Sequence, residues 1–222
     1  MLYTVETYLL LFFIYSIGGW LMEVIGKLIE KRKFVNRGFL IGPYCPIYGH
    51  GAILITILLQ KYIDDPIALF IMGVVVCSIL EYLTSYFMEK IFHARWWDYS
   101  RYKFNINGRI CLRTMIPFGL LGLFIMYVSN PFFFSIIEKI PGNILNIICI
   151  VLMLIFLVDN IISFKIISNV NITSKKIKDN TEEITEKVKA ILEKKSALHR
   201  RLVHAFPEMK MRIREKIKNK IN

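Results

Sequence analysis

Long apolar runs constrain the fold of this chain more than any other feature. A helix needs about 20 mainly apolar residues to cross roughly 30 Å of hydrocarbon, and several runs meet this length. We predict spans at residues 7–28, 44–62, 67–90, 110–129 and 143–165. The segment 130–143 is too short and too interrupted by proline to cross, and it is predicted to link the last two spans at the interface. The sequence therefore predicts an all-α, polytopic membrane helix bundle of about five transmembrane helices.

Composition excludes an ordinary water-soluble domain. Hydrophobic residues make up 55% of the 222 residues, above the roughly 45–50% of soluble domains. The formal net charge is +12, and residues 175–222 contribute 15 Lys and Arg against 7 Asp and Glu. In a membrane protein such charge is first a signal of topology and lipid contact. We therefore predict no nucleic-acid partner, and no cofactor or metal site is predicted.

The basic residues also predict the orientation. They follow the first, third and fifth predicted spans, as Lys27, Lys31, Arg32, Lys33 and Arg37, then Lys90, Arg95, Arg101, Lys103 and Arg109, then Lys165 and the tail. Loops rich in Lys and Arg stay in the cytoplasm. This pattern predicts a multi-pass protein of the cell (plasma) membrane with its N-terminus outside and its C-terminus cytoplasmic.

The chain divides into a transmembrane helical domain, 1–168, and a basic cytoplasmic tail, 169–222. Apolar residues recur through the tail at helical spacing and predict an amphipathic helix that ends at Pro207: Ile177, Ile184, Val188, Ile191, Leu198 and Leu202. Such a helix can lie on anionic lipid headgroups. Docking on a cytoplasmic partner, or pairing with another copy in a homo-oligomer, is the alternative.

Three carboxylates within the spans are the main pointers to function. Glu23, Glu81 and Asp159 lie at similar predicted depth, in the cytoplasmic half. Each costs about 2.5–3.5 kcal/mol at the centre of a bilayer on insertion scales. The third span extends the pattern into a stripe on one helix face, at Cys77, Glu81, Ser85 and Glu89. We therefore predict a polar cavity that opens to the cytoplasm.

Arginines are the available partners of these carboxylates. Arg109 and Arg113 begin the fourth span, and Arg37 and Arg95 lie in the loops. A buried ion pair that only fixes helix register is the alternative to a binding cavity. The predicted substrate-binding residues are Glu23, Arg37, Glu81, Asp98, Asn107, Arg109, Arg113 and Asp159.

The connection between the third and fourth spans, "IFHARWWDYSRYKFNINGRICL", combines two kinds of residue. Its Trp, Tyr and Lys residues are typical of a membrane interface. The run "NINGR" predicts a tight turn, with Asn or Gly in the left-handed region, that aims Arg109 at the bundle.

Enzyme activity is an open alternative. His93 and Asp98 form H-x-x-x-x-D, in which the carboxylate can orient a histidine acting as general base on an acceptor hydroxyl of a lipid. No G-x-x-x-x-G-K-[ST] occurs, so the chain lacks the Walker motif of an ATPase. The four single cysteines are predicted to pack as small hydrophobes.

Four ordered motifs, "GGWLMEV", "NRGFLIGPYCPIYGHGA", "LEYLTSYFMEKIFHARWWDYS" and "FNINGRICL", resemble the bacterial membrane-protein family of ABC-transporter type IV, the CmpB-like permeases. The resemblance covers about residues 8–165, and the chain also resembles eukaryotic transmembrane protein 229 more distantly. It implies a permease subunit that works with a separate ATPase chain. The alternatives are a membrane-embedded enzyme acting on lipid, or a non-catalytic scaffold or sensor that recruits a partner through its tail.

Overall fold

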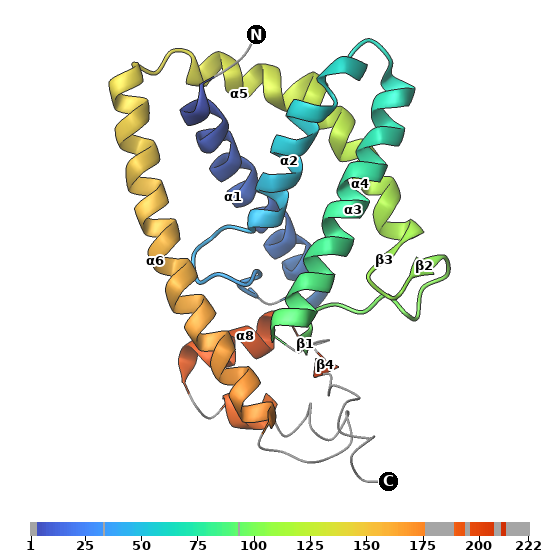
Figure 1. Ribbon diagram of the computed structural model, residues 1–222, viewed down its shortest axis with the longest axis vertical. Helices are drawn as coiled ribbons and strands as arrows, with labels where there is room; N and C mark the ends of the chain where they lie inside the picture. The colour runs from blue at the N-terminus through green and yellow to red at the C-terminus, as the bar shows by residue number, and fades with distance from the viewer. Residues whose placement is uncertain are drawn as a thin grey trace.

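The computed structural model describes residues 4–32, 34–92, 94–175, 189–193, 196–206 and 210–211, which form a helical bundle (Figure 1). The labelled α-helices are α1 (Val5–Lys31), α2 (Pro46–Leu58), α3 (Pro66–Phe92), α4 (Leu112–Phe124), α5 (Asn130–Ile137), α6 (Gly142–Lys175) and α8 (Ala197–Ala205). The short elements are a 3-10 turn, η1 (Gln60–Tyr62), a π-helical turn, η2 (Ile125–Ser129), and strands β1 (Ala94–Arg95), β2 (Asn105–Ile106), β3 (Ile110–Cys111) and β4 (Lys210–Met211). The predicted all-α fold is confirmed. Helices α1, α3 and α6 all finish at the end of the bundle where α8 lies, which we call the tail end (Figure 1).

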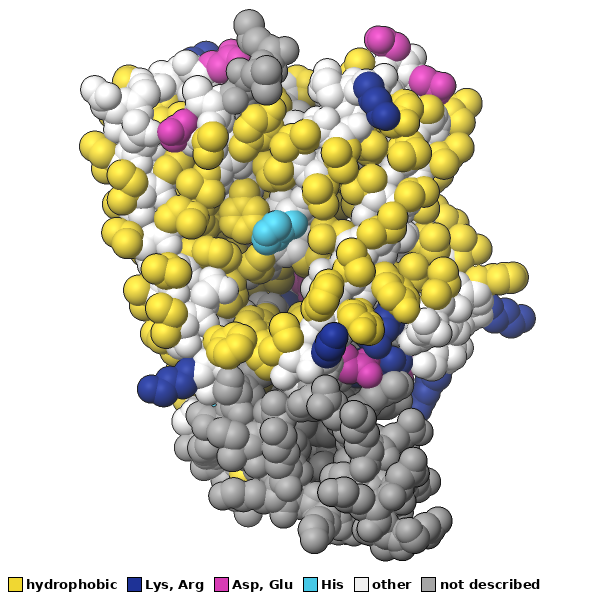
Figure 2. All heavy atoms as spheres, in the orientation of Figure 1, with side chains coloured by type: hydrophobic (Ala, Val, Ile, Leu, Met, Phe, Trp, Pro, Cys, Tyr) yellow, Lys and Arg dark blue, Asp and Glu magenta, His cyan; other side chains and the backbone are white. Residues whose placement is uncertain are grey.

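Four described helical runs are long and apolar enough to cross a membrane: Val5–Glu30, Pro66–Phe92, Leu112–Ile137 and Gly142–Ile166. The predicted second span is wrong in length, because only the 13 residues of α2 are α-helical there and these cover about 20 Å. Proline is well tolerated in the first turn of a helix, where its missing N–H is not needed, and Pro46 stands there in α2. Figure 2 shows hydrophobic side chains over the middle of one face and charged side chains toward its two ends.

The fourth span also differs from the prediction. Helix α4 does not stop at residue 129 but passes through the π turn η2 into α5, which ends at Ile137. Pro131 lies directly after the π turn, and prolines and π turns are usual places for a helix to bend. The predicted interfacial link 130–143 is therefore mostly helical, and α5 leans across the end of the bundle opposite the tail end (Figure 1).

Glycines let the helices of the bundle pack closely. Helix α1 packs along α2, and α3 packs along α4. A Cβ atom built on Gly49 of α2 would lie 2.3 Å from Ser16 Oγ and 2.6 Å from the backbone oxygen of Phe12, both on α1. Small residues of this kind allow backbones to approach in membrane helix pairs.

We expect Gly49→Ala to destabilise the protein by about 1–3 kcal/mol, because the added methyl group forces α1 and α2 apart. The measurement is the free energy of unfolding of the purified protein in detergent. Gly18→Ala is the matched control, since Gly18 is exposed on α1 and its Cβ would meet nothing within 4 Å. That change should be neutral or stabilising by up to about 1 kcal/mol, the helix propensity of alanine over glycine. Equal losses in both variants would contradict close packing at Gly49.

The segment between α1 and α2 turns back into the bundle. Helix α1 is capped by Arg32, which has a left-handed backbone (φ 51°), and Gly38 is also left-handed (φ 99°). Leu40 is only 1% exposed. In Figure 1 this segment lies between α1, α6 and the start of α2. Non-helical backbone at membrane depth needs hydrogen-bond partners from the protein itself.

The described part of the tail packs on the bundle. Its apolar side chains join those of α3 and β1 in one cluster: Phe92, Ala94, Trp96, Leu192, Leu202, Val203, Ala205 and Phe206. Strand β4 pairs antiparallel with β1. Of the predicted apolar stripe, Leu202 is buried but Ile191 and Leu198 are exposed, so the buried face is rotated from the prediction. The stripe residues 177–188 lie outside the described residues.

Candidate functional site

A cavity of about 630 Å³, which we call the central cavity, lies within the bundle toward the tail end. Residues from α1, α2, α3, α4, the 37–45 segment and the 97–111 segment line it, together with Asn160 of α6 and Phe206 beyond α8. Most of the lining side chains are aliphatic or aromatic. The ionisable acids and cations in the lining are Glu23, Arg37, Glu81 and Arg113. The predicted polar cavity is therefore an apolar chamber with a few charged groups.

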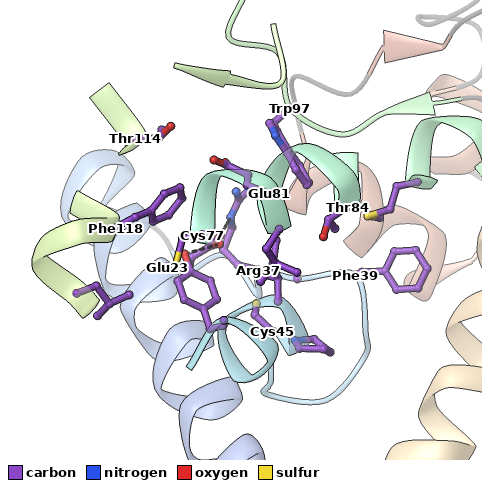
Figure 3. Close-up of a pocket in the computed structure, with 18 of the residues that line it drawn as sticks. Glu23, Arg37, Phe39, Cys45, Cys77, Glu81, Thr84, Trp97, Thr114 and Phe118 are labelled. Atoms are coloured by element: carbon purple, nitrogen blue, oxygen red, sulfur yellow. Dashed lines mark hydrogen bonds and ion pairs between the residues drawn. The ribbon is translucent and has the colours of Figure 1, made fainter. Parts of the chain in front are cut away.

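The first lining carboxylate, Glu23 of α1, is balanced by Arg37. The Nε atom of Arg37 lies 2.9 Å from Glu23 Oε2, and the Tyr48 hydroxyl donates to Glu23 Oε1 at 3.1 Å. Arg37 also donates to the backbone oxygen of Ala205 and lies over the Phe206 ring, 5.2 Å from its centroid. The predicted site residues Glu23 and Arg37 are thus brought together as an ion pair. Figure 3 shows both of them with Glu81 among the side chains that line the cavity.

The second lining carboxylate, Glu81 of α3, makes no ion pair with a described residue. It is 8% exposed, and its Oε1 accepts a hydrogen bond from the Tyr99 hydroxyl at 3.3 Å. Its Oε2 is buried and has no hydrogen-bond donor among the described residues. Burial, followed by the charge of Glu81, raises the pKa of Tyr99, which keeps this phenol a neutral donor.

Arg109 does not pair with Glu81. Its guanidinium binds Glu89 Oε2 at 3.0 Å and donates to Ser85 Oγ at 3.1 Å. Arg95 also binds Glu89 Oε2, at 3.0 Å. The predicted stripe on α3 does face the interior, since Cys77, Glu81 and Ser85 are buried. About two turns of helix separate Glu89, which binds the two arginines, from Glu81, which binds neither of them.

The "NINGR" turn forms as predicted. Asn107 and Gly108 are both left-handed, with φ of 53° and 65°, and they connect β2 to β3, whose register pairs Ile106 with Ile110. The side-chain oxygen of Asn105 accepts from the Gly108 N–H at 2.9 Å. Asn107 donates through its side chain to the Tyr82 hydroxyl at 2.8 Å. The turn thus directs the next residue, Arg109, toward α3, but neither Asn107 nor Arg109 lines the central cavity.

Two further predicted residues lie at the edge of the site. Asp98 accepts from the N–H and hydroxyl of Ser100 and lies 3.6 Å from Arg95, outside the cavity lining. Arg113 does line the cavity and is exposed, with its guanidinium 5.5 Å from the centroid of the Tyr102 ring. His93, the other half of H-x-x-x-x-D, lies outside the described residues.

Asp159 of α6 binds the segment before α2 rather than the cavity. Its carboxylate accepts from the backbone N–H groups of Ile41 (2.9 Å) and Gly42 (2.7 Å). It also accepts from the hydroxyls of Tyr44 (2.5 Å) and Ser163 (2.8 Å). Two backbone donors of a non-helical segment are thereby satisfied inside the bundle. Asp159 therefore positions the cavity wall without belonging to it.

The tail contributes contacts that sequence reasoning missed. Phe206 lines the cavity and packs edge-on against Trp96, with ring centroids 4.9 Å apart. Arg201 of α8 donates to the backbone oxygens of Gly38 (3.2 Å) and Leu40. Burial lowers the pKa of Arg201, and the negative charge of Asp159 opposes that shift. No spacing or motif in the sequence marks these tail residues as part of the site.

The described part of the chain contains no group of three or more His, Cys, Asp or Glu side chains placed to hold a metal ion. All four cysteines are free and buried, as predicted for small hydrophobic side chains.

Long apolar helices and buried charged groups around an internal cavity define an integral membrane protein of the polytopic helical class. The chain belongs to the family described as "Putative ABC-transporter type IV", whose model matches residues 10–164. The predicted resemblance is thereby confirmed, and the match includes every lining residue of the cavity except Phe206. Comparisons with curated proteins and with solved structures found no match.

Proposed function

We propose that the protein is the permease subunit of a transporter and that the central cavity holds the transported solute. The observation that carries this proposal is Glu81, a buried carboxylate that lines a cavity of about 630 Å³ with one oxygen free of any described donor. Cavities of roughly 300–1,000 Å³ hold small organic ligands. Membership of a transporter-type family supports the same function.

A permease of this kind needs a separate ATPase chain, because the sequence lacks a Walker motif. Affinity purification of the tagged full chain from its own membranes tests this requirement. We expect a nucleotide-binding chain to co-purify and the complex to hydrolyse ATP. A complex that instead turns over lipid would favour the enzyme alternative, and a complex with neither activity would refute the permease.

Glu81→Gln tests the cavity within that complex. The substitution keeps the size of the side chain and removes its charge. We expect the variant to retain the ATPase chain but to lose about tenfold or more of the ATP hydrolysis stimulated by a small-molecule extract, the equivalent of one charge-assisted hydrogen bond. Glu138→Gln is the matched control, since Glu138 is exposed and lies outside the cavity lining. If the extract stimulated ATP hydrolysis by Glu81→Gln as strongly as in the wild type, Glu81 would not be part of the binding site.

The tail end is proposed to face the cytoplasm. The basic connection after α1, the 94–111 segment and the end of α6 all lie there (Figure 1), and Lys and Arg favour the cytoplasmic side. Reporter fusions at residues 64, 102 and 222 should report outside, inside and inside. A C-terminal reporter outside would reverse the orientation. The basic tail is proposed to contact anionic lipid at that side.

The scaffold alternative is less favoured. Helix α8 buries Leu202, Val203 and Ala205 against the chain's own bundle. These three side chains therefore contact the bundle of the chain itself and not a separate partner.

A further inference from the structure

The central cavity has one acid that none of the described residues balances with an opposite charge. Its two lining carboxylates are Glu23 and Glu81. Arg37 binds Glu23 at 2.9 Å, whereas the described residues place no Lys, Arg or His nitrogen within 4.0 Å of Glu81, as the ion pairs of this region show. An unbalanced charge at such a buried position is strongly unfavourable.

The neighbouring arginines are held elsewhere. Arg95 and Arg109 both bind Glu89, and the Arg109 guanidinium also lies 5.5–5.6 Å from the ring centroids of Tyr82 and Tyr86. Moving Arg109 to Glu81 would break these contacts and its bond to Ser85. Arg113 also lines the cavity, but its guanidinium lies 5.5 Å from the centroid of the Tyr102 ring and forms no ion pair with Glu81. The counter-charge of Glu81 therefore does not come from these three arginines.

The rest of the cavity fits an apolar molecule that carries a positive charge. Tyr99, which donates to Glu81, lines the cavity, and Trp97 and Phe118 add further aromatic faces (Figure 3). Aromatic rings attract cations through their negative faces. The aliphatic lining of α2 and α4 offers apolar surface to the remainder of a ligand.

We propose that the central cavity binds an amphipathic organic cation, whose ammonium N–H groups donate to Glu81 Oε2 while its apolar body lies against α2 and α4. This substrate class deepens the proposed transport function and rests on the same cavity. A proton on Glu81 would satisfy the carboxylate in a different way, and the cavity would then select neutral amphiphiles.

Three probes of matched shape separate these cases: 4-phenylbutylamine, 4-phenylbutanol and 4-phenylbutyrate. Binding is measured by isothermal titration calorimetry on the purified full chain in phosphatidylcholine nanodiscs, with empty nanodiscs as the blank for partitioning into lipid. We expect the wild type to bind the amine at least about tenfold more tightly than the alcohol, as one charge-assisted hydrogen bond predicts, and to bind the carboxylate least.

Glu81→Gln should bind the amine and the alcohol equally, whereas Glu138→Gln should keep the wild-type preference. Equal binding of amine and alcohol by the wild type would overturn the proposal, even if the Glu81 variant failed to fold. A preference that survives in a folded Glu81→Gln would do the same.

The outcomes also separate this proposal from the permease itself. Amine selectivity in a protein without an ATPase chain would refute the permease and leave the cation site. An ATPase-linked complex without amine selectivity would refute only the cation site.

Discussion

Asp159→Ala is expected to lower the free energy of unfolding by roughly 3–5 kcal/mol, the range for breaking a buried charged network. The carboxylate accepts four hydrogen bonds, and its loss leaves the N–H groups of Ile41 and Gly42 without their acceptor inside the bundle. Each unsatisfied buried group of this kind costs about 1–3 kcal/mol. The measurement is equilibrium unfolding in detergent, followed by circular dichroism.

Two variants control this experiment. Asp159→Asn keeps one acceptor oxygen and the shape of the side chain, so about half of the loss is expected. Asn146→Ala removes an exposed polar side chain from the same helix and should change the stability by less than about 0.5 kcal/mol. If Asp159→Ala were as mild as Asn146→Ala, the carboxylate would not be what holds the 37–45 segment.

Phe206→Ala is expected to open the tail end of the central cavity and to speed maleimide labelling of Cys45 by at least about tenfold. Cys45 lines the cavity and is buried. Truncating a well-packed phenylalanine costs about 3–5 kcal/mol. Each 1.4 kcal/mol of this cost that falls on the docking of α8 shifts the equilibrium between docked and undocked α8 by tenfold. Labelling of the purified protein with N-ethylmaleimide is followed at each cysteine by mass spectrometry.

Cys149 is the internal control, because it is buried in a different cluster near α5 and does not line the cavity. His204→Ala is the matched variant, since His204 is exposed on the same helix as the contacts that hold Phe206. Phe206→Ala should leave the labelling rate of Cys149 unchanged, and His204→Ala should leave the labelling rate of Cys45 unchanged. An unchanged Cys45 rate in Phe206→Ala would mean that α8 does not close the cavity.

Both predictions follow from one chain of contacts. Asp159 holds the backbone at Ile41 and Gly42, and Arg201 holds the same segment at Gly38 and Leu40. The cavity wall is therefore clamped between α6 and α8. Losing the hydrogen bonds of either Asp159 or Arg201 should therefore make the 37–45 segment, which carries Arg37, less well held.

Local patterns in the sequence were sufficient for several features of the site. The four-residue spacing of Cys77, Glu81 and Ser85 predicts their common face, because helix geometry fixes that face without any distant contact. The "NINGR" turn is equally local, since its left-handed positions depend on Asn and Gly themselves.

The pairing of charges could not be read in the same way. Glu81 and Glu89 both lie on α3. Arg95 and Arg109 bind Glu89 only because of the way in which the 94–111 segment packs on α3. Similarly, Asp159 was predicted to line the cavity but meets a segment 117 and 118 residues away in sequence.

The sequence by itself determined that this chain is a membrane helix bundle with buried carboxylates, because span length and helical spacing are local properties of the chain. Tertiary structure alone decided that Glu81 is the acid without a described counter-charge and that Phe206 of the tail borders the cavity. These features depend on contacts between distant segments, and the free energy of such contacts depends on how the helices are packed.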